Sequence, residues 1–586
     1  PDNIVTRNGD TLEDDWPYFD ENDPIGTYDP LYVDAVVSNP PYSQAWNPTD
    51  KETDPRYARF GLAPKGKADY AFLLHDLFHL KSDGIMTIVL PHGVLFRGGE
   101  EGEIRKNLIE QNHIDAIIGL PANIFFGTGI PTIIMVLKQK RSNTDVLIVD
   151  ASKGFIKVGK NNKLRASDIK RIVDVVTKRE SVQKFSKVVS RDEIRINDYN
   201  LNIPRYVDSS EAAESWDIYA SMFGGLPLSE IDELKEYWIA FPELKTALFE
   251  NTSSAYCSLK AENIKKAIKE HADVCSFEKE YRDVFSGFDE YLYDELIEKM
   301  TALNISKAEA TLSANIFERL KDIPLVDKYE AYQLLDDDWT KIAVDLEIIQ
   351  TEGFEATKRV DPNMVIKKKD GKEQEVQEGW VGRIIPFDLI QDTLLADDKA
   401  ALKAKENRLS EISSEYEELF DSLTEEEKEG DYASEDGFVN AEIKKALKSD
   451  SVEPETKEKL RKVAALATEE KELKAAIKKD AGLLEGKTKE TIESLSDEQV
   501  IDLLKDKWIT PLIQSLMKLP DSIVNELVSK LEALTKKYET TFAEVETQIS
   551  ETEKALSAMI DDLEGNEFDM LGLSEFRKML GGVQND

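Results

Sequence analysis

The sequence predicts an α/β fold, in which half of a doubly wound sheet is followed by a large, mainly α-helical region. Two observations lead to this prediction. Short apolar runs alternate with amphipathic segments from residue 32 to residue 149, which is the order of elements in an α/β sheet. From Leu402 onward, apolar residues recur at heptad spacing, which is typical of long packed helices.

Length and composition limit the class of protein. The chain has 586 residues, of which 41% are hydrophobic, so several domains with real cores are expected. Its two cysteines, Cys257 and Cys275, argue against a disulfide scaffold and favour a reducing, cytoplasmic environment. No apolar run approaches the ~20 residues of a membrane span, so no membrane association is expected. Because the sequence begins with Pro1, we expect an upstream segment to be missing.

Charge is distributed unevenly along the chain. The net charge is −40, but the first 200 residues hold 26 basic and 29 acidic residues and are nearly neutral. Residues 151–200 alone hold 13 basic and 6 acidic residues. The first third is therefore compatible with a polyanion such as DNA, whereas the acidic remainder should be repelled by one and is better suited to a protein partner.

The elements of the first 200 residues can be predicted in order. Strands are expected at 32–38, 84–90, 115–120, 132–137 and 146–149, because each is a short run rich in apolar and β-branched residues. Helices are expected at 68–80 and 100–111. The third and fourth strands are joined by a Gly/Pro-rich loop, "PANIFFGTGIP".

The first strand ends in an unusual turn, "SNPPY". Prolines interrupt the hydrogen-bond ladder of a sheet and stiffen the backbone beyond it. The residues of this turn are therefore held rigidly at the carboxyl end of the strand, where open α/β sheets bind their ligands. An aromatic amine must pyramidalise before it can accept a methyl group. The side-chain oxygen of Asn39 and the carbonyl of Pro40 could accept its two hydrogens, with Pro41 fixing the direction. The ring of Tyr42 could stack on a base rotated out of a duplex.

This turn and the sequence after it resemble a known family. Asn39-Pro40-Pro41-Tyr42 is similar to the catalytic motif of adenine-N6 methyltransferases, although Phe is more common at the last position. The stretch from "KADYAFLLHDLFHL" to "GIPTIIMVLKQ", and "RDEIRINDYNLNIPRYVD" at 191–208, resemble the modification (M) subunit of type I restriction-modification systems. The resemblance implies a fold with a partial Rossmann-like methyltransferase sheet. It also implies an activity, the transfer of a methyl group from S-adenosylmethionine to adenine N6 in DNA.

The same resemblance implies partners and further site residues. The partners would be a specificity (S) subunit, a second M subunit, in some cases a restriction (R) subunit, and duplex DNA with a flipped adenine. Phe125 or Phe126 would pack against that adenine, and Asp10, in "NGDTL", would lie near the cofactor. No metal site is expected, since the His75/His79 pair lies on a helix predicted to be buried and lacks a neighbouring glutamate base.

Three domains are expected: the carboxyl half of the methyltransferase domain at 1–208, a helical or mixed interaction domain at 209–396, and an acidic helical domain at 397–586. A polar hairpin is expected around Asp370-Gly371. Heptad runs at 402–423 and 527–563 predict coiled-coil helices, which would pair with each other or bind a partner. A single helix from 527 to 563 would be ~55 Å long.

Several alternatives remain open from the residues alone. The turn could serve methylation of a protein glutamine or an RNA base, a single-chain restriction-methyltransferase, or a non-catalytic scaffold. The glycine-rich turn that holds the cofactor in this class should lie upstream of "NGDTL". These 586 residues alone are therefore expected to bind S-adenosylmethionine weakly or not at all.

Overall fold

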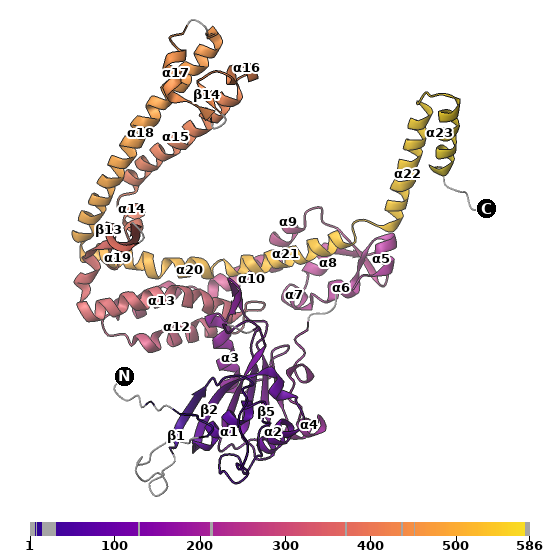
Figure 1. The fold of residues 1–586 in the computed structure, drawn as a ribbon, viewed down its shortest axis with the longest axis vertical. Helices are drawn as coiled ribbons and strands as arrows, with labels where there is room; N and C mark the ends of the chain where they lie inside the picture. Colours follow the sequence, from indigo (N-terminus) through magenta and orange to yellow (C-terminus); the bar gives the residue numbers. More distant parts are fainter. Residues whose placement is uncertain are drawn as a thin grey trace. The chain divides into compact units, whose positions relative to one another are not determined.

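A computed structural model describes residues 6, 9–13, 31–126, 129–210, 215–369, 372–434, 437–449 and 452–580 (Figure 1). The chain forms two compact units. One comprises Pro1–Ile268, Asp327–Gln333 and Leu527–Asp586, and the other comprises Lys269–Val326 and Leu334–Glu526. The predicted methyltransferase region lies in the first of these units.

A six-stranded sheet forms the core of the first unit, in the order β1-β2-β4-β3-β5-β8. Its strands are β1 (Val33–Ser38), β2 (Leu80–Pro91), β3 (Ile114–Gly119), β4 (Thr132–Lys138), β5 (Val146–Asp150) and β8 (Ser186–Val189). The five predicted strands are thus confirmed, whereas β8 was not foreseen. The sheet is mixed, because β4 runs antiparallel to both β2 and β3. Parallel pairing, as expected for a doubly wound sheet, is found for β1–β2 and β3–β5. The pairing of β4 departs from it: the described part of the β3–β4 loop contains no helix, so the chain returns at the same edge.

Helices cover both faces of this sheet. The two predicted helices are present as α1 (Asp69–Phe78) and α2 (Glu100–Glu110). They pack on one face with α4 (Arg191–Ile196), in a core that includes Met135. On the opposite face, α3 (Ala166–Lys178) packs against a second core that includes Val136. Successive residues of β4 therefore point to opposite faces, as the pleat requires.

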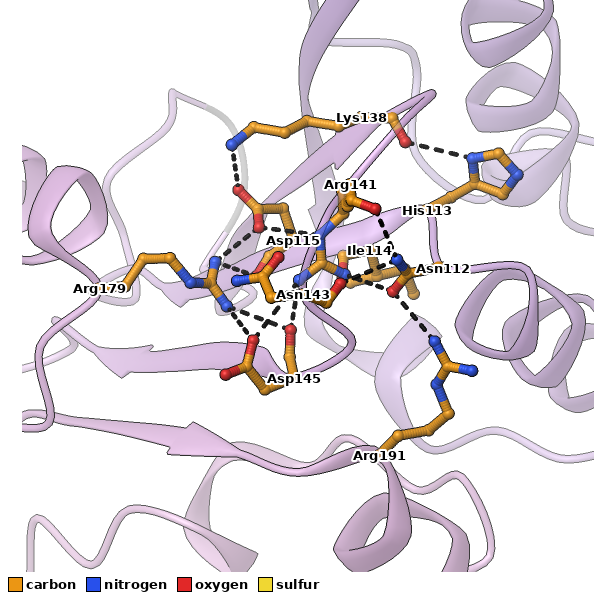
Figure 2. A network of polar contacts seen from close by, with 10 residues as sticks. All are labelled: Asn112, His113, Ile114, Asp115, Lys138, Arg141, Asn143, Asp145, Arg179 and Arg191. Carbon is orange, nitrogen blue, oxygen red and sulfur yellow. Dashed lines mark hydrogen bonds and ion pairs between the residues drawn. The ribbon is translucent and has the colours of Figure 1, made fainter. Parts of the chain in front are cut away.

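Ion pairs join the amino ends of β3 and β5 to neighbouring segments (Figure 2). The buried carboxylate of Asp115 lies 2.7 Å from Lys138 Nζ, 3.0 Å from Arg141 Nε and 2.6 Å from Arg179 Nη1. Arg179 also contacts Asp145 at 2.9 Å. Burial lowers the pKa of Arg141, while Asp115 raises it. This network fixes the edge of the sheet opposite to the Asn-Pro-Pro-Tyr turn.

The remaining elements are mainly helical. Elements in the first unit are η1 (His92–Leu95), β6 (Ile156–Val158), β7 (Asn161–Lys163), η2 (Ile203–Arg205), α5 (Ile218–Phe223), β9 (Leu226–Pro227), α6 (Leu228–Asp232), α7 (Lys235–Ala240), α8 (Leu244–Leu248), β10 (Phe249–Asn251), β11 (Tyr256–Leu259), α22 (Phe542–Asp561) and α23 (Glu567–Leu580). Elements wholly or largely in the second unit are α10 (Ala272–Val284), α11 (Phe288–Leu292), η3 (Tyr293–Glu298), α12 (Ile305–Leu320), α13 (Lys328–Glu352), η4 (Phe354–Lys358), β12 (Val360–Lys369), β13 (Lys372–Gly382), α14 (Phe387–Thr393), α15 (Ala396–Asp421), α16 (Glu425–Lys428), β14 (Ala433–Ser434), β15 (Gly437–Phe438), α17 (Asn440–Ala446), α18 (Pro454–Glu493), α19 (Asp497–Trp508) and α20 (Thr510–Leu516). Among the described elements, α13 also crosses the boundary between the units, as do α9 (Ile264–Lys269) and α21 (Leu519–Lys537).

The two heptad runs differ in whether they form the long helices that were predicted. The first lies in α15, which packs along α18, with Arg408 Nε 2.7 Å from Glu469 Oε1. The predicted continuous helix from 527 to 563 was wrong, because α21 ends at Lys537 and α22 begins at Phe542. Thr541 caps α22 through a capping box with Glu544, which stabilises a new helix start inside the run.

The predicted polar hairpin is confirmed as β12 and β13, which pair from Val360/Gly382 to Lys369/Lys372. Its turn residues, Asp370 and Gly371, lie outside the described residues. None of the helices in the described ranges is both long and apolar enough to cross a membrane.

Candidate active site

The Asn-Pro-Pro-Tyr turn comes directly after the last residue of β1, Ser38. Asn39 and Pro41 are exposed, while Pro40 and Tyr42 are half-buried. The Tyr42 hydroxyl donates a hydrogen bond to Asn39 Oδ1 at 2.8 Å. Burial raises the pKa of Tyr42, so the hydroxyl remains a donor at neutral pH. The structure thus brings the predicted acceptor and the predicted stacking ring together.

The segment after the turn is held by the start of α1. The Ser43 backbone N–H donates to Asp69 Oδ1 at 2.7 Å, and Ser43 has a φ of +51°. One residue further, the Gln44 carbonyl accepts a hydrogen bond from the Ala68 N–H at 2.8 Å. Because a positive φ is costly for serine, the backbone here needs such external contacts. Asp69 is therefore a positioning residue for the turn.

A short chain of charges supports Asp69, whose side chain is fully buried. Its second oxygen, Oδ2, lies 3.5 Å from Arg97 Nη1, which is also 3.3 Å from Glu101 Oε1. Burial is the main cause that raises the pKa of Glu101. The sequence alone did not point to Asp69 or to its neighbours Arg97 and Glu101. The available signal was an acidic residue in the first turn of a predicted buried helix.

A second carboxyl group, Asp76 on α1, lies beside the last residue of β1. Burial raises its pKa to about 6, although a hydrogen bond from Ser38 and the nearby His79 lower it. Its Oδ2 is buried and has no hydrogen-bond partner among the described residues. Asp76 thus adjoins the residue that precedes Asn39, and its protonation should affect the stability of this strand end.

The same edge of the sheet also holds His92 and both ends of the loop that carries Phe125 and Phe126. Since β1 and β2 are parallel, the turn and His92 follow the carboxyl ends of neighbouring strands. The antiparallel pairing of β4 with β2 and β3 places the ends of the 120–131 loop at this edge too, and Gly119 pairs with Asp150 of β5. The backbone N–H of His92 donates to the Pro131 carbonyl at 3.1 Å. Burial lowers the pKa of His92, which favours its neutral form.

The two candidate phenylalanines of that loop differ in environment. Phe125 packs against the core between the sheet and α3. Phe126 is 92% exposed. Phe126 is therefore the one of the two that a ligand could contact, whereas Phe125 contributes to the core.

Asp10, the cofactor candidate, is exposed, and its carboxylate accepts the Leu12 N–H at 3.0 Å. Asn8 lies outside the described residues. Gly99, with a φ of +64°, precedes α2, but Glu100 and Glu103 lie in the first turn of that helix. The start of α2 is therefore not suited to an anionic group. No cluster of three or more metal-ligating side chains is found in the described part of the chain either.

Comparison with known proteins matches the first third of the chain. Residues 1–215 match the family model described as N-6 DNA Methylase. The methylase subunit of the type I restriction enzyme MpnII from Mycoplasma pneumoniae is 43% identical over 190 residues, covering 32% of this chain and 35% of that protein. The MjaVII methylase subunit from Methanocaldococcus jannaschii is 35% identical over 218 residues, covering 35% of this chain and 36% of that protein.

Among solved structures, a type I restriction-modification methyltransferase subunit from Streptococcus thermophilus is 51% identical, with a TM-score of 0.34. The match covers 36% of this chain and 43% of that one. The chain thus spans about a third of the length of the curated relatives it matches. The resemblance drawn from the sequence is confirmed, since these homologues are methylase subunits of type I restriction enzymes.

Proposed function

We propose that this chain carries the target-base side of a DNA methyltransferase that transfers a methyl group from S-adenosylmethionine to adenine N6, as a subunit of a type I restriction-modification system. One observation carries the proposal. At the carboxyl end of β1, the Asn-Pro-Pro-Tyr turn holds an amide oxygen and an aromatic ring together, with the Tyr42 hydroxyl 2.8 Å from Asn39 Oδ1. The match of residues 1–215 to the N-6 DNA Methylase family supports it.

The turn would act on the exocyclic amine of the flipped adenine. Asn39 Oδ1 and the Pro40 carbonyl would each accept one of its hydrogens, which favours the pyramidal nitrogen that can attack a methyl group. Both acceptors are held before the base arrives, so little reorganisation is needed. Tyr42 would stack on one face of the base, and Phe126 would contact it from the 120–131 loop.

Partners are inferred from the charge distribution and from the relatives. The S subunit would supply sequence recognition, and a second M subunit and an R subunit would complete the assembly. The region after residue 200 carries nearly all of the net charge of −40, which opposes contact with DNA phosphates and favours protein partners. The methyl donor would be S-adenosylmethionine, and only the handling of the amine is derived from this chain's residues.

The test is transfer of labelled methyl groups by the complete assembly. Substrates would be an adenine-containing duplex, the same duplex with N6-methyladenine at the target, an RNA and a protein fraction. We expect label in the first duplex alone, with loss of transfer in the Asn39→Ala variant. Asn47→Ala is the matched control, since Asn47 is an exposed amide in the same loop whose oxygen bonds only locally to the Thr49 N–H. Label in protein or RNA, or in no substrate, would refute the proposal.

A further inference from the structure

The segment between β5 and α3 is unusually basic. Between Asp150 and Asp168 the chain carries four lysines and one arginine and no acidic residue. Two of these five cations are used internally. Lys153 donates to the Ser209 carbonyl, and Arg165 lies 3.1 Å from Asp168 and 3.0 Å from Glu330. The other three, Lys157, Lys160 and Lys163, are exposed and make no ion pair with the described residues.

These three lysines lie on a short two-stranded hairpin. β6 and β7 pair antiparallel from Ile156/Lys163 to Val158/Asn161. The connection is a two-residue turn in which Gly159 has a φ of +62°, as hairpin turns of the primed type require at that position. Lys160 occupies the tip, and Lys157 and Lys163 lie on the two strands.

The hairpin is attached to the loop that carries Phe126. The Asn162 backbone N–H donates to the Asn123 carbonyl at 2.9 Å, and Asn162 Nδ2 donates to the Ala122 carbonyl at 2.7 Å. Lys157 is the cross-strand partner of Asn162, so both side chains lie on the same face of the hairpin. At least one of the three lysines is thus on the face of the hairpin that contacts the 120–131 loop.

Position along the sheet supports a role in binding the substrate. The hairpin comes after the carboxyl end of β5, at the same edge as Asn39, and the strand order places β5 four steps from β1. Neighbouring strands lie ~4.8 Å apart, so β1 and β5 are separated by ~19 Å across the sheet. This distance corresponds to five or six base pairs, each ~3.4 Å along a duplex. A duplex running along this edge with its adenine at Asn39 would pass over the hairpin.

We propose that the β6–β7 hairpin is a clamp for the DNA backbone, in which Lys157, Lys160 and Lys163 contact phosphates about half a helical turn from the flipped adenine. The inference rests on the proposed function. Exposed lysines act as mobile point charges that bind phosphate without reading sequence. The clamp would therefore add affinity equally for all sequences.

Lysine footprinting on the complete assembly tests the clamp directly. The assembly is acetylated with and without an adenine-containing duplex, and the modified lysines are identified by mass spectrometry. We expect duplex to protect Lys157, Lys160 and Lys163, and to leave Lys140 and Lys178, which lie toward the opposite edge of the sheet, fully reactive. Unchanged reactivity of the hairpin lysines, or protection by the partner subunits before DNA is added, would overturn the inference.

Salt dependence gives the quantitative test. The triple variant Lys157→Gln/Lys160→Gln/Lys163→Gln should lower the slope of log K against log[salt] by about 2.7 and weaken duplex binding about tenfold or more at low salt. The control is Lys81→Gln/Lys140→Gln/Lys178→Gln, with the same charge change toward the opposite edge and an unchanged slope. An unchanged slope in the hairpin variant refutes the clamp while wild-type methyl transfer still supports the proposed function. Absence of wild-type transfer to DNA refutes the proposed function itself.

Discussion

The Tyr42 hydroxyl lies 2.8 Å from Asn39 Oδ1 and donates a hydrogen bond to it. An amide oxygen has two lone pairs, so this bond leaves one acceptor site for the adenine amine. The bond also restrains the rotation of the Asn39 side chain, which is otherwise exposed. The ring that would stack on the base thus also orients the group that would bind its amine.

Removing the Asn39 amide should abolish methyl transfer. Loss of one preorganised hydrogen-bonding group in comparable sites lowers the rate on the order of 10²–10³-fold. The Asn39→Ala assembly should keep its thermal unfolding midpoint and its affinity for duplex, because Asn39 is exposed. Single-turnover transfer of labelled methyl groups measures the effect, with Asn47→Ala as control. Transfer at the wild-type rate would show that the turn is not the catalytic element.

The two functions of Tyr42 can be separated. Tyr42→Ala should weaken stacking by ~1–3 kcal/mol, whereas Tyr42→Phe keeps the ring and loses only a hydrogen bond worth about 1 kcal/mol. Fluorescence of 2-aminopurine at the target position reports the flipped base. We expect clear loss of the flipped state for the alanine variant and a change of only a few-fold in transfer for the phenylalanine variant. Equal defects in both variants would assign the main role to the hydroxyl.

Asp69 should act on the turn through Ser43. Asp69→Ala leaves the Ser43 N–H without its buried acceptor and leaves Arg97 paired with Glu101 alone, which should cost about 1–3 kcal/mol of stability and slow methyl transfer. Asp69→Asn retains an acceptor oxygen and should restore much of the transfer rate. Urea denaturation and single-turnover rates, measured on the same samples, distinguish the two effects. A stability loss with an unchanged rate would limit Asp69 to a structural role.

The raised pKa of Asp76 predicts a pH dependence of stability. With a folded pKa of about 6 and an ordinary value of 3.8, the folded state binds the proton more tightly than the unfolded state. The resulting stability is present below about pH 4 and is lost as the pH rises through 6, by up to about 3 kcal/mol.

Asp76→Asn should remove this dependence, because asparagine stays neutral. The measurement is the difference in urea midpoint between wild type and variant from pH 4.5 to pH 7.5, which cancels the effect of the large net charge. The variant should gain stability relative to wild type as the pH rises. A constant difference across this range would contradict the raised pKa.

The ion pairs around Asp115, at the edge of the sheet opposite to Asn39, should affect stability and not methyl transfer. Asp115→Asn would leave Lys138, Arg141 and Arg179 clustered around a neutral side chain, and breaking such a buried network typically costs about 3–5 kcal/mol. Asp192→Asn, which breaks a surface pair with Arg195, should cost less than about 1 kcal/mol. Both variants should transfer methyl groups normally per folded molecule. A transfer defect in folded Asp115→Asn would indicate coupling across the sheet.

Local sequence determined much of this fold. Five of the six strands contain an apolar run that could be recognised without distant contacts. Pro40 and Pro41 likewise show locally that β1 ends where the candidate site begins. The break between α21 and α22 was also encoded locally, in Thr541 and Glu544. It was missed because the heptad spacing continues across it, whereas the capping box acts only on the first turn of a helix.

Tertiary structure decided the order of the strands and the support of the site. The antiparallel placement of β4 between β2 and β3 depends on pairing energies across the whole sheet, which no single segment contains. The same is true of Asp69, which reaches Ser43 across 26 residues, and of Asn162, which holds the basic hairpin to a loop 40 residues earlier. Sequence determined which residues could do the chemistry, because residue type and local turn geometry are properties of a short segment. Only folding decided which side chains hold them in place, because those contacts join segments that are distant in the chain and gain their energy from shared burial.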